Sequence, residues 1–575
     1  MSPDRRAGPG TPGGDKLAPM RAANALIELA QSEGADRVFG NPGTTELPLM
    51  DALAGVPEFP YYLGLHEGTV VSMADGFARA TGRPSFVNLH IAAGLAHGLA
   101  NILNARRART PMVVTVGQQD RRHLIQDPML GGDLLAIAQG GFKHAVEVTR
   151  TEDLPTLIRR AFLISQTEPM GPVMVSIPVD VLEEELEGPL PPRTEPLGLG
   201  VAQGVDELAE ALLGAGAPAI VAGDGVGRAG AVPELVELAE ALGATVFHEP
   251  MYDCVDFPAT HALSAGMLPP VDLEIREKLA PHDAVFLVGS HAFSAHYYTD
   301  ASPIPARTRV LQLDPDRTEL GRNYPASIAL HGGISPTIRA LTALIDGRCA
   351  EAADRLATAQ RERAERESAE VTSAPPSERI DPTAAAEALV AGLPEDTVMI
   401  EEAITTGIAV RKAFAADRPG SYHHSVGGAL GWGIGGGIGV KIARPDQPVV
   451  TVVGDGTAMY TIQGLWSAAH YDVPLVVVVM NNREYAACKR GMPRVLSGPP
   501  SENYVGMDLT DPEIDFVSLA GSLGVGARSV DGAEELTAAV SEALASGEPT
   551  LIEAAVVGTA DRTSGLAAAP SAAKR

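Results

Sequence analysis

The sequence predicts an α/β protein with three domains, each built on a doubly wound parallel sheet. Short apolar runs that end in Gly or a polar turn alternate with stretches of helical periodicity, the pattern of βα units. The chain of 575 residues is several times the size that one hydrophobic core supports. Breaks rich in Pro or in charge separate three blocks of this pattern, so we predict one domain for each block.

Each block is marked by its own apolar runs. The first contains RVFG, SFVNLH and PMVVTVG, the second contains PAIVAG, AVFLVGS and RVLQLD, and the third contains QPVVTVVGDG and VPLVVVVMNN. A Pro-rich stretch ends the first block, and a charged, Ala-rich stretch that we interpret as a solvated helix and a linker follows the second. The predicted domains are 20–190, 200–345 and 380–560, with tails or a linker at 1–19, 346–379 and 561–575.

The charge balance argues against a nucleic-acid partner. Lys and Arg total 44 against 72 Asp and Glu, a net charge of −28 that would repel a phosphate backbone. With 45% hydrophobic and 20% charged residues, the chain has the composition of a folded globular protein. An anionic substrate would therefore need a local basic pocket.

Cysteine usage and hydropathy indicate a cytoplasmic protein without a membrane partner. Cys254, Cys349 and Cys488 are widely spaced and form no CxxC motif, which argues against a disulfide framework and a zinc knuckle. The longest strongly apolar run, Leu475–Met480, is far shorter than the roughly 20 residues that span a bilayer. Residues 1–16 are rich in Pro and Gly and lack an apolar core, so we expect no signal peptide.

The third block contains two polar motifs, each placed directly after a predicted strand. Asp455, within GDG, follows VVTVV, and Asn482, within NN, follows LVVVVM, with 24 residues between the two motifs. Open α/β sheets bind ligands at the carboxyl edge of their strands, where both motifs would lie. Mg²⁺ prefers oxygen ligands, and we expect Asp455, the Asn482 side chain and the main-chain carbonyl of Glu484 to supply them.

Small residues around Asp455 indicate a diphosphate site beside this metal. Gly454 and Gly456 would let the main chain approach a diphosphate closely. Thr457 follows them, where the start of a helix would add hydrogen-bond donors. The spacing of strand, GDG, strand and NN is far more selective than GDG alone.

This arrangement resembles the cofactor motif of the thiamine-diphosphate-dependent enzyme family. The resemblance extends through residues 20–560 and is strongest to the benzoylformate decarboxylase branch, in the phrases FGNPGTTELPLMDAL, HEGTVVSMADGFARATG, FVNLHIAAG, TVGQQ and MNNREYAA. It implies a pyrimidine-binding first domain, a Rossmann-like middle domain and a diphosphate-binding last domain. It also implies thiamine diphosphate and Mg²⁺ as cofactors, and a homodimer or homotetramer with active sites between subunits.

The resemblance assigns catalytic roles to four residues. Glu67 matches the family's acid that exchanges a proton with the aminopyrimidine ring of the cofactor. His90 and His296 match two active-site histidines, which can protonate the enamine that CO₂ loss leaves and help release an aldehyde. Thr44 matches a serine that contacts the substrate carboxylate.

Further matches concern contacts with the cofactor. Leu430 corresponds to the bulky aliphatic residue that holds the cofactor bent, although core packing would also explain a leucine there. Glu402, Thr405 and the Gly428 carbonyl map onto other cofactor contacts.

Several positions depart from the benzoylformate decarboxylase pattern. His424 and Gly491 stand where that branch has aromatic rings, and Lys489 and Arg490 lie beside the second of them. Since apolar rings give an aryl substrate its site, we expect a polar, acidic or longer 2-oxo acid instead. His97 stands where the family usually has Asn. The expected substrate pocket comprises Thr44, His90, His296, His424 and Arg490.

The favoured function is non-oxidative decarboxylation of a 2-oxo acid to an aldehyde and CO₂ through an enamine intermediate. A carboligase of the acetohydroxyacid-synthase type would use the same intermediate, and a catalytically silent partner subunit is a third possibility. Gly225-x-Gly227-x-x-Gly230 in the second block matches a dinucleotide fingerprint, but a lone match of this kind is weak. The branch that this chain resembles leaves its middle domain empty, so we expect no FAD.

Overall fold

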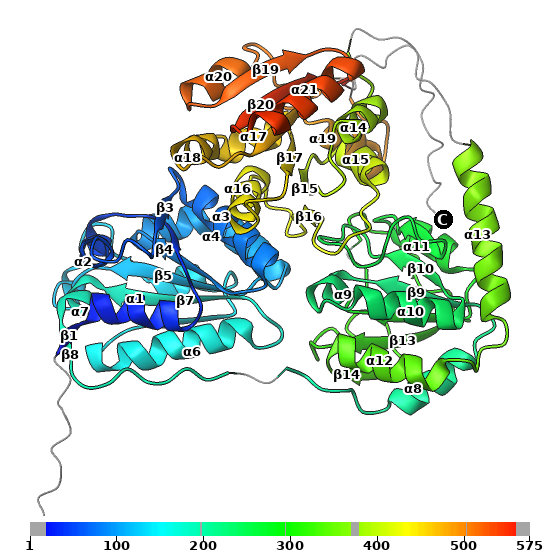
Figure 1. Ribbon diagram of the computed structural model, residues 1–575, viewed down its shortest axis with the longest axis horizontal. Coiled ribbons are helices and arrows are strands. Elements are labelled where there is room, and N and C mark those ends of the chain that lie inside the picture. Colours follow the sequence, from blue (N-terminus) through cyan, green and yellow to red (C-terminus); the bar gives the residue numbers. More distant parts are fainter. Residues whose placement is uncertain (1–18, 196–197, 294, 370–378, 502, 559–575) are drawn as a thin grey trace, which may run out of the picture.

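The computed structural model describes residues 19–195, 198–293, 295–369, 379–501 and 503–558. Three α/β domains follow one another along the chain and meet near the centre of the molecule (Figure 1). Each has a sheet of six parallel strands with helices on both faces, which confirms the predicted fold class. Of the tails expected at 1–19 and 561–575 and the linker expected within 346–379, residues 1–18, 370–378 and 561–575 lie outside the described residues.

The first domain has its strands in the order β3-β2-β4-β5-β7-β6. A short antiparallel pair, β1 with β8, joins its two ends at Met20 and Leu186. The elements are β1 (Met20–Arg21), α1 (Ala22–Ser32), β2 (Val38–Asn41), η1 (Thr44–Glu46), α2 (Leu47–Leu53), β3 (Tyr61–Leu63), α3 (Glu67–Thr81), β4 (Ser85–Leu89), α4 (Ile91–Arg107), β5 (Met112–Gln118), η2 (Leu124–Gln126), α5 (Leu134–Ala138), β6 (His144–Glu147), η3 (Thr151–Asp153), α6 (Leu154–Gln166), β7 (Pro172–Pro178), α7 (Val179–Glu183) and β8 (Glu185–Leu186).

The second domain has the strand order β11-β10-β9-β12-β13-β14. A long charged helix, α13, stands at the edge of the molecule and packs on this domain through α10 (Figure 1). The elements are α8 (Val205–Leu213), β9 (Pro218–Ala222), α9 (Asp224–Arg228), α10 (Val232–Leu242), β10 (Thr245–His248), β11 (Ser264–Met267), α11 (Asp272–Leu279), β12 (Ala284–Val288), β13 (Arg309–Asp314), β14 (Ile328–His331), α12 (Ile334–Ile345) and α13 (Ala352–Ala369).

The third domain has the order β16-β15-β17-β18-β20-β19. Its central strands are continuous apolar runs, as expected for a parallel sheet covered on both faces. The elements are α14 (Pro382–Ala391), β15 (Val398–Glu402), α15 (Gly407–Phe414), β16 (Tyr422–His424), α16 (Gly433–Ala443), β17 (Val449–Gly454), α17 (Asp455–Thr461), α18 (Gly464–His470), β18 (Val476–Asn481), α19 (Ala486–Val495), α20 (Phe516–Ser522), β19 (Gly526–Val530), α21 (Ala533–Ser546) and β20 (Thr550–Ala555).

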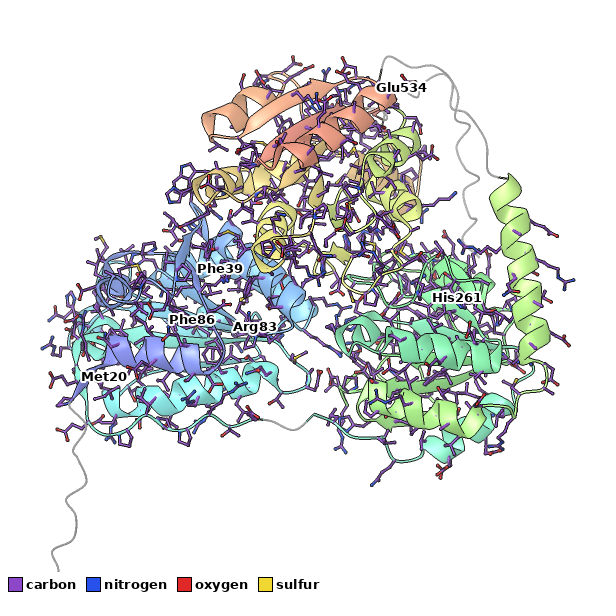
Figure 2. The ribbon with its side chains drawn as sticks, viewed as in Figure 1. Met20, Phe39, Arg83, Phe86, His261 and Glu534 are labelled. Atoms are coloured by element: carbon purple, nitrogen blue, oxygen red, sulfur yellow. The ribbon has the colours of Figure 1, made fainter. Side chains whose placement is uncertain are left out.

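The hydrophobic core shows how the domains are joined. Phe39 and Phe86 lie on opposite faces of the first sheet, both buried (Figure 2). The cluster that contains Phe39 continues without a break into one face of the third sheet. The first and third domains therefore share a core. The second domain has two clusters of its own and joins the third domain through Tyr252 and Val255.

Helices α3 and α16 form the contact between the first and third domains. Gly76 on α3 faces Gly436 on α16 so closely that a Cβ at Gly76 would lie 2.1 Å from the Gly436 carbonyl oxygen. Gly439 is packed in the same way against Met73. These glycines bring the start of α3, where Glu67 lies, close to the loop before α16.

Among the described residues, none of the helices combines the length and apolar character needed to cross a bilayer.

Candidate functional site

Strands β17 and β18 deliver the predicted metal ligands to one edge of the third sheet. The strands are parallel neighbours, with Gly454 opposite Met480, so Asp455 and Asn482 both follow the carboxyl ends. Asp455 is 4% exposed, and its Oδ1 accepts a hydrogen bond from the Gly456 N–H at 2.9 Å. Its Oδ2 is buried without a hydrogen-bond partner in the described structure. Burial raises the pKa of Asp455 to about 6, although nearby backbone N–H groups oppose this.

The loop after β18 turns its polar atoms toward this carboxylate. The Asn482 side-chain oxygen accepts the Glu484 N–H at 3.0 Å. The backbone N–H groups of Arg483 and Glu484 are among those that act to lower the pKa of Asp455. An unpartnered carboxylate oxygen beside an amide oxygen and main-chain carbonyls is a donor set that fits a hard cation such as Mg²⁺.

Gly454 and Gly456, on either side of Asp455, differ in how closely other protein atoms approach them. A Cβ at Gly456 would lie 2.6 Å from the Tyr485 ring, so this position requires glycine because of the protein itself. A Cβ at Gly454 would meet the Thr457 hydroxyl at 3.7 Å as its nearest neighbour. Space for a close ligand is therefore open at Gly454, and Thr457 lies beside it.

Glu402 organises the loop that carries the predicted cofactor contacts. Its carboxylate accepts hydrogen bonds from the N–H groups of Gly431, Trp432 and Gly433, at 3.1, 3.1 and 2.7 Å. Burial raises its pKa to about 8 against the effect of these donors. Glu402 is 1% exposed, so in this chain it acts by holding the loop in place.

The loop itself contains Gly428 and Leu430. Gly428 has φ +79° and therefore adopts a conformation that favours glycine. Leu430 is half-buried, in contrast to a leucine that only packs in a core. Asn104 on α4 fixes the loop by exchanging two hydrogen bonds with the backbone of Ala429. Thr405, after β15, is also half-buried.

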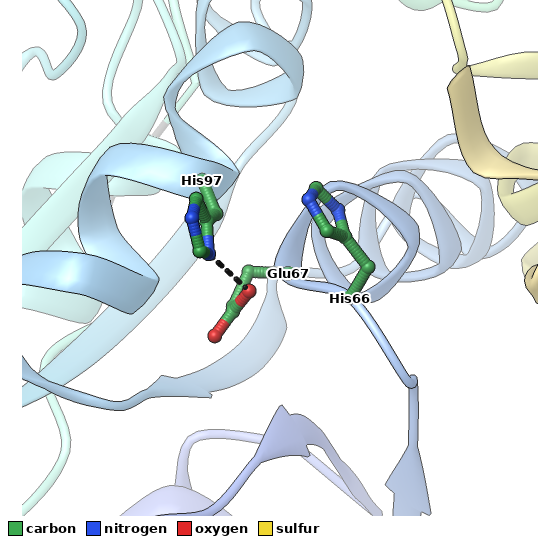
Figure 3. A group of neighbouring side chains, drawn as sticks. All are labelled: His66, Glu67 and His97. Atoms are coloured by element: carbon green, nitrogen blue, oxygen red, sulfur yellow. Dashed lines mark hydrogen bonds and ion pairs between the residues drawn. The ribbon is translucent and has the colours of Figure 1, made fainter.

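Glu67 begins α3 and is 8% exposed. Its Oε2 lies 3.1 Å from Nδ1 of His97, and the ring of His66 stacks on that of His97 (Figure 3). The ligand atoms of these three side chains lie within 4.8 Å of one another, so they could also hold a metal ion. Such an ion would occupy the carboxylate that we expect to exchange a proton with the cofactor.

His90 is paired with a buried acid that sequence reasoning missed. Its Nδ1 lies 2.7 Å from Oε2 of Glu46, which is 1% exposed, and 3.2 Å from the Thr45 hydroxyl. A Cβ at Gly43 would lie 2.2 Å from the His90 ring, so that glycine makes room for the pair. Thr44 is exposed, whereas its neighbour Thr45 is buried and donates to Glu46. The sequence signal that could have indicated this pair was Glu46 itself. It follows GTT directly, at the position of a capping-box glutamate, and accepts the Gly43 N–H.

His296 lies in the second domain, where its backbone N–H donates to the Pro270 carbonyl at 2.9 Å. Its side chain is exposed and its ring meets that of Tyr297 edge to face, with centroids 4.6 Å apart. Tyr297 in turn faces α19, because a Cβ at Gly491 would lie 2.9 Å from the Tyr297 hydroxyl. A phenol from the second domain therefore fills the space that a side chain at position 491 would occupy.

The polar residues expected near the substrate differ in their exposure and in their partners within the protein. Lys489 is 5% exposed and pairs with Glu484 and Asp508, so its charge is neutralised within the protein, which corrects its expected place in a basic pair. Arg490 is exposed on α19. His424 is fully buried, with Nδ1 at 2.8 Å from the Glu401 carbonyl and Nε2 without a partner in the described structure.

Within one chain the predicted residues form two separate groups. Glu67 and His90 lie on the first domain, and Asp455 and Asn482 lie at the edge of the third sheet. Two contacts link the start of α3 with the third domain. The Asn101 side chain donates to the carbonyls of both Gly68 and Gly431, and a Cβ at Gly68 would lie 3.6 Å from Thr461, at the far end of α17 from Asp455. A helix of seven residues is about 10 Å long.

Two glycines of the dinucleotide-like motif, Gly225 and Gly227, are packed against protein, whereas Gly230 has φ +61° and open space beside it. A Cβ at Gly225 would lie 2.7 Å from the backbone of Gly289, and one at Gly227 would lie 2.5 Å from the Val255 carbonyl oxygen. The buried carboxylate of Asp224 occupies the start of α9. These residues therefore allow close packing of chain segments within the second domain.

Comparisons with known proteins agree with this geometry. Three family domains match in order: "Thiamine pyrophosphate enzyme, N-terminal TPP binding domain" at residues 20–143, its "central domain" at 205–341 and its "C-terminal TPP binding domain" at 402–554. The chain is a thiamine-diphosphate-dependent enzyme. It is 34% identical to the benzoylformate decarboxylase of Pseudomonas aeruginosa over 540 residues, which cover 92% of this chain and 98% of that protein.

Other members of the thiamine-diphosphate family are similar along the whole chain. The large subunit of acetolactate synthase isozyme 3 from Escherichia coli is 29% identical, covering 91% of this chain and 92% of that protein. The solved structure of the thiamine diphosphate-dependent 4-hydroxybenzoylformate decarboxylase of Rhodococcus jostii RHA1 superposes with a TM-score of 0.84 at 31% identity, covering 94% and 99%. The enzyme is thus related to both decarboxylases and acetolactate synthases.

Proposed function

We propose that this enzyme removes the carboxylate of a 2-oxo acid as CO₂ and releases the corresponding aldehyde. The pair formed by His90 and Glu46 carries the proposal. Because His90 Nδ1 lies 2.7 Å from the Glu46 carboxylate, one ring proton is held on Nδ1 toward Glu46. A second proton, taken up at Nε2, is then the one that the ring delivers to the substrate. Delivery of a proton to carbon after CO₂ has left is the step that ends in an aldehyde.

The proposed cofactors are thiamine diphosphate and Mg²⁺. When bound, thiamine diphosphate supplies a carbon nucleophile and an electron sink. Asp455, the Asn482 side chain and the Glu484 carbonyl would hold Mg²⁺, as their oxygen donors and the unpartnered Asp455 Oδ2 support. The other residues that we propose to line the cofactor site are Glu402, Thr405, Gly428, Leu430, Gly454, Gly456 and Thr457.

The proposed role of Glu67 is to exchange a proton with the aminopyrimidine ring. Glu67→Gln keeps the size of the side chain but cannot carry that proton. We expect CO₂ release to fall by at least about 100-fold while cofactor affinity, measured by calorimetry, stays near that of the wild type. The exposed Glu58→Gln is the matched control and should leave both quantities unchanged. Turnover near the wild-type rate in Glu67→Gln would contradict the mechanism.

We further propose that each active site combines Glu67 of one subunit with Asp455 of a second subunit. Large apolar side chains near both groups support a subunit interface. Leu65 and Leu103 on the first domain are 45% and 44% exposed, and Met459 and Tyr460 on α17 are 42% and 53% exposed. Burying such side chains against a second copy would stabilise a dimer.

Complementation between two inactive variants tests the shared site. Glu67→Gln and Asp455→Asn should each be inactive as homodimers. In a dimer that contains one chain of each variant, one of the two sites has both native residues. Random mixing should therefore restore about a quarter of wild-type activity. If both residues serve a site within one chain, mixing restores nothing.

We propose that the substrate carries a polar or acidic group beyond its 2-oxo acid. The Tyr297 hydroxyl faces Gly491, and Arg490 and Arg494 are exposed on the same helix. We assign the substrate end of the pocket to Thr44, His90, His296, His424 and Arg490. A panel of aryl, aliphatic, acidic and guanidino 2-oxo acids, with kcat/KM for CO₂ release, tests this class. A preference for aryl acids would contradict it.

A second candidate function is carboligation, which the likeness to acetolactate synthase favours. The same substrate would then be joined to a second carbonyl compound. Product identification from one 2-oxo acid, with and without an added aldehyde, separates the two outcomes. CO₂ release by the purified chain alone would also exclude a silent partner subunit.

A further inference from the structure

The Glu67 carboxylate is oriented by α4. His97, on that helix, places Nδ1 3.1 Å from Glu67 Oε2. A Cβ at Gly94, one turn earlier, would lie 3.0 Å from Glu67 Oε1, so glycine leaves that side of the carboxylate open. The Glu67 side chain is 11% exposed, whereas that of His97 is 57% exposed. His97 therefore connects a nearly buried carboxylate with the surface of the subunit (Figure 3).

His66 holds the His97 ring without competing for its proton. The two rings are stacked, with centroids 5.2 Å apart and an interplanar angle of 23°. His66 Nδ1 accepts the Gly68 N–H at 3.0 Å and so caps α3, which requires this nitrogen to be unprotonated. Burial lowers the pKa of His66, partly opposed by Glu67. His66 is therefore a neutral surface against which the His97 ring rests.

We propose that His97 is a positioning residue that also relays protons between solvent and Glu67. In the relay, Nε2 of His97 takes a proton from water and the Nδ1 proton passes to Glu67 Oε2. One proton has then moved from solvent to the carboxylate, and His97 is again neutral. The reverse sequence removes a proton from Glu67. This inference rests on the proposed function, in which Glu67 must gain and lose a proton in each cycle.

Two other titratable groups near Glu67 in the described part of the chain do not offer this route. Tyr61, from β3 on the sheet side, has its pKa raised well above its ordinary value by burial and by Glu46, so its phenol stays protonated. His66, from the start of α3, is held neutral by its capping bond. His97 adds an exposed imidazole, and each of its two ring nitrogens can accept or donate a proton.

Hydrogen–deuterium exchange at the thiazolium C2 of the bound cofactor tests the relay without any substrate. The holoenzyme, loaded with thiamine diphosphate and Mg²⁺, is quenched after short times between pH 5.5 and 8. Wild type is compared with His97→Ala, His97→Asn and, as a control, the exposed His144→Asn. Cofactor affinity is measured for each variant, which separates relay from binding.

We expect His97→Ala to slow exchange by at least about tenfold, and added imidazole to restore much of it. His97→Asn keeps a donor for Glu67 but cannot relay, so cofactor affinity should be kept while exchange is slow and imidazole has no effect. His144→Asn should match wild type. Wild-type exchange in His97→Ala, or slow exchange without rescue by imidazole, would overturn the proposal. Normal exchange without CO₂ release from any 2-oxo acid would instead overturn the proposed function.

Discussion

The Arg79 guanidinium lies 3.5 Å from the Asp253 carboxylate and ties α3, which begins with Glu67, to the second domain. The same guanidinium pairs with Asp75 at 3.1 Å and donates to the His424 carbonyl of the third domain at 2.8 Å. The side chains of Arg79, Asp75 and Asp253 are 9%, 0% and 4% exposed. All three domains therefore meet at one buried cation.

Arg79→Met should destabilise the fold by about 3 to 5 kcal/mol, because Asp75 would remain buried without its cation and Asp253 would keep only Arg228. Chemical denaturation measures the change. Arg83→Met is the control, since Arg83 and its partner Asp36 are 48% and 40% exposed and such pairs contribute below about 1 kcal/mol. Equal losses of stability in both variants would show that the buried ion pairs of Arg79 contribute no more than the exposed pair of Arg83.

The three sheets could be predicted from sequence because their central strands have strong local signals. The apolar runs before Asp455 and Asn482 are β17 and β18, in the predicted positions. By contrast, β1 and β8 have two residues each and pair across the whole first domain, too short for any periodicity to indicate. The charged stretch after the second domain does form a helix, α13.

The site was less predictable where it depends on contacts between distant residues. Glu46 and His90 are 44 positions apart, and their pairing follows from the parallel order of β2 and β4 rather than from spacing. The contact of His97 with Glu67 likewise needs α3 and α4 to pack face to face. By contrast, Asp455 could be predicted as a site residue from sequence, because its position depends only on one strand and the turn that follows it.

Binding of Mg²⁺ should depend on pH through Asp455. Burial raises its pKa from an ordinary 3.8 to about 6 in the metal-free protein, and a cation requires the ionised form. Affinity for Mg²⁺ with the cofactor present should therefore fall about fivefold between pH 6 and 5, and change little between pH 7 and 8. Calorimetry at each pH measures this, and a flat profile would contradict the assignment.

The raised pKa of Asp455 also predicts the stability of an Asp455→Asn variant. Because the folded protein binds this proton more tightly than the unfolded chain, Asp455 lowers the stability of the metal-free fold as pH rises from about 4 to 6. Asp455→Asn should remove Mg²⁺ binding yet stabilise the metal-free protein at pH 7, by about 3 kcal/mol. The exposed Asp446→Asn should change neither quantity.

Tyr297 and Gly491 should be energetically coupled. A Cβ at Gly491 would lie 2.9 Å from the Tyr297 hydroxyl but 3.9 Å from its Cζ, so removing the hydroxyl removes the clash. We expect Gly491→Ala to lower kcat/KM about fivefold, the effect of roughly 1 kcal/mol of overpacking. In a Tyr297→Phe background the same substitution should cost almost nothing. An equal loss in both backgrounds would mean that the hydroxyl does not fill the space beside position 491, and that this residue shapes the pocket by another route.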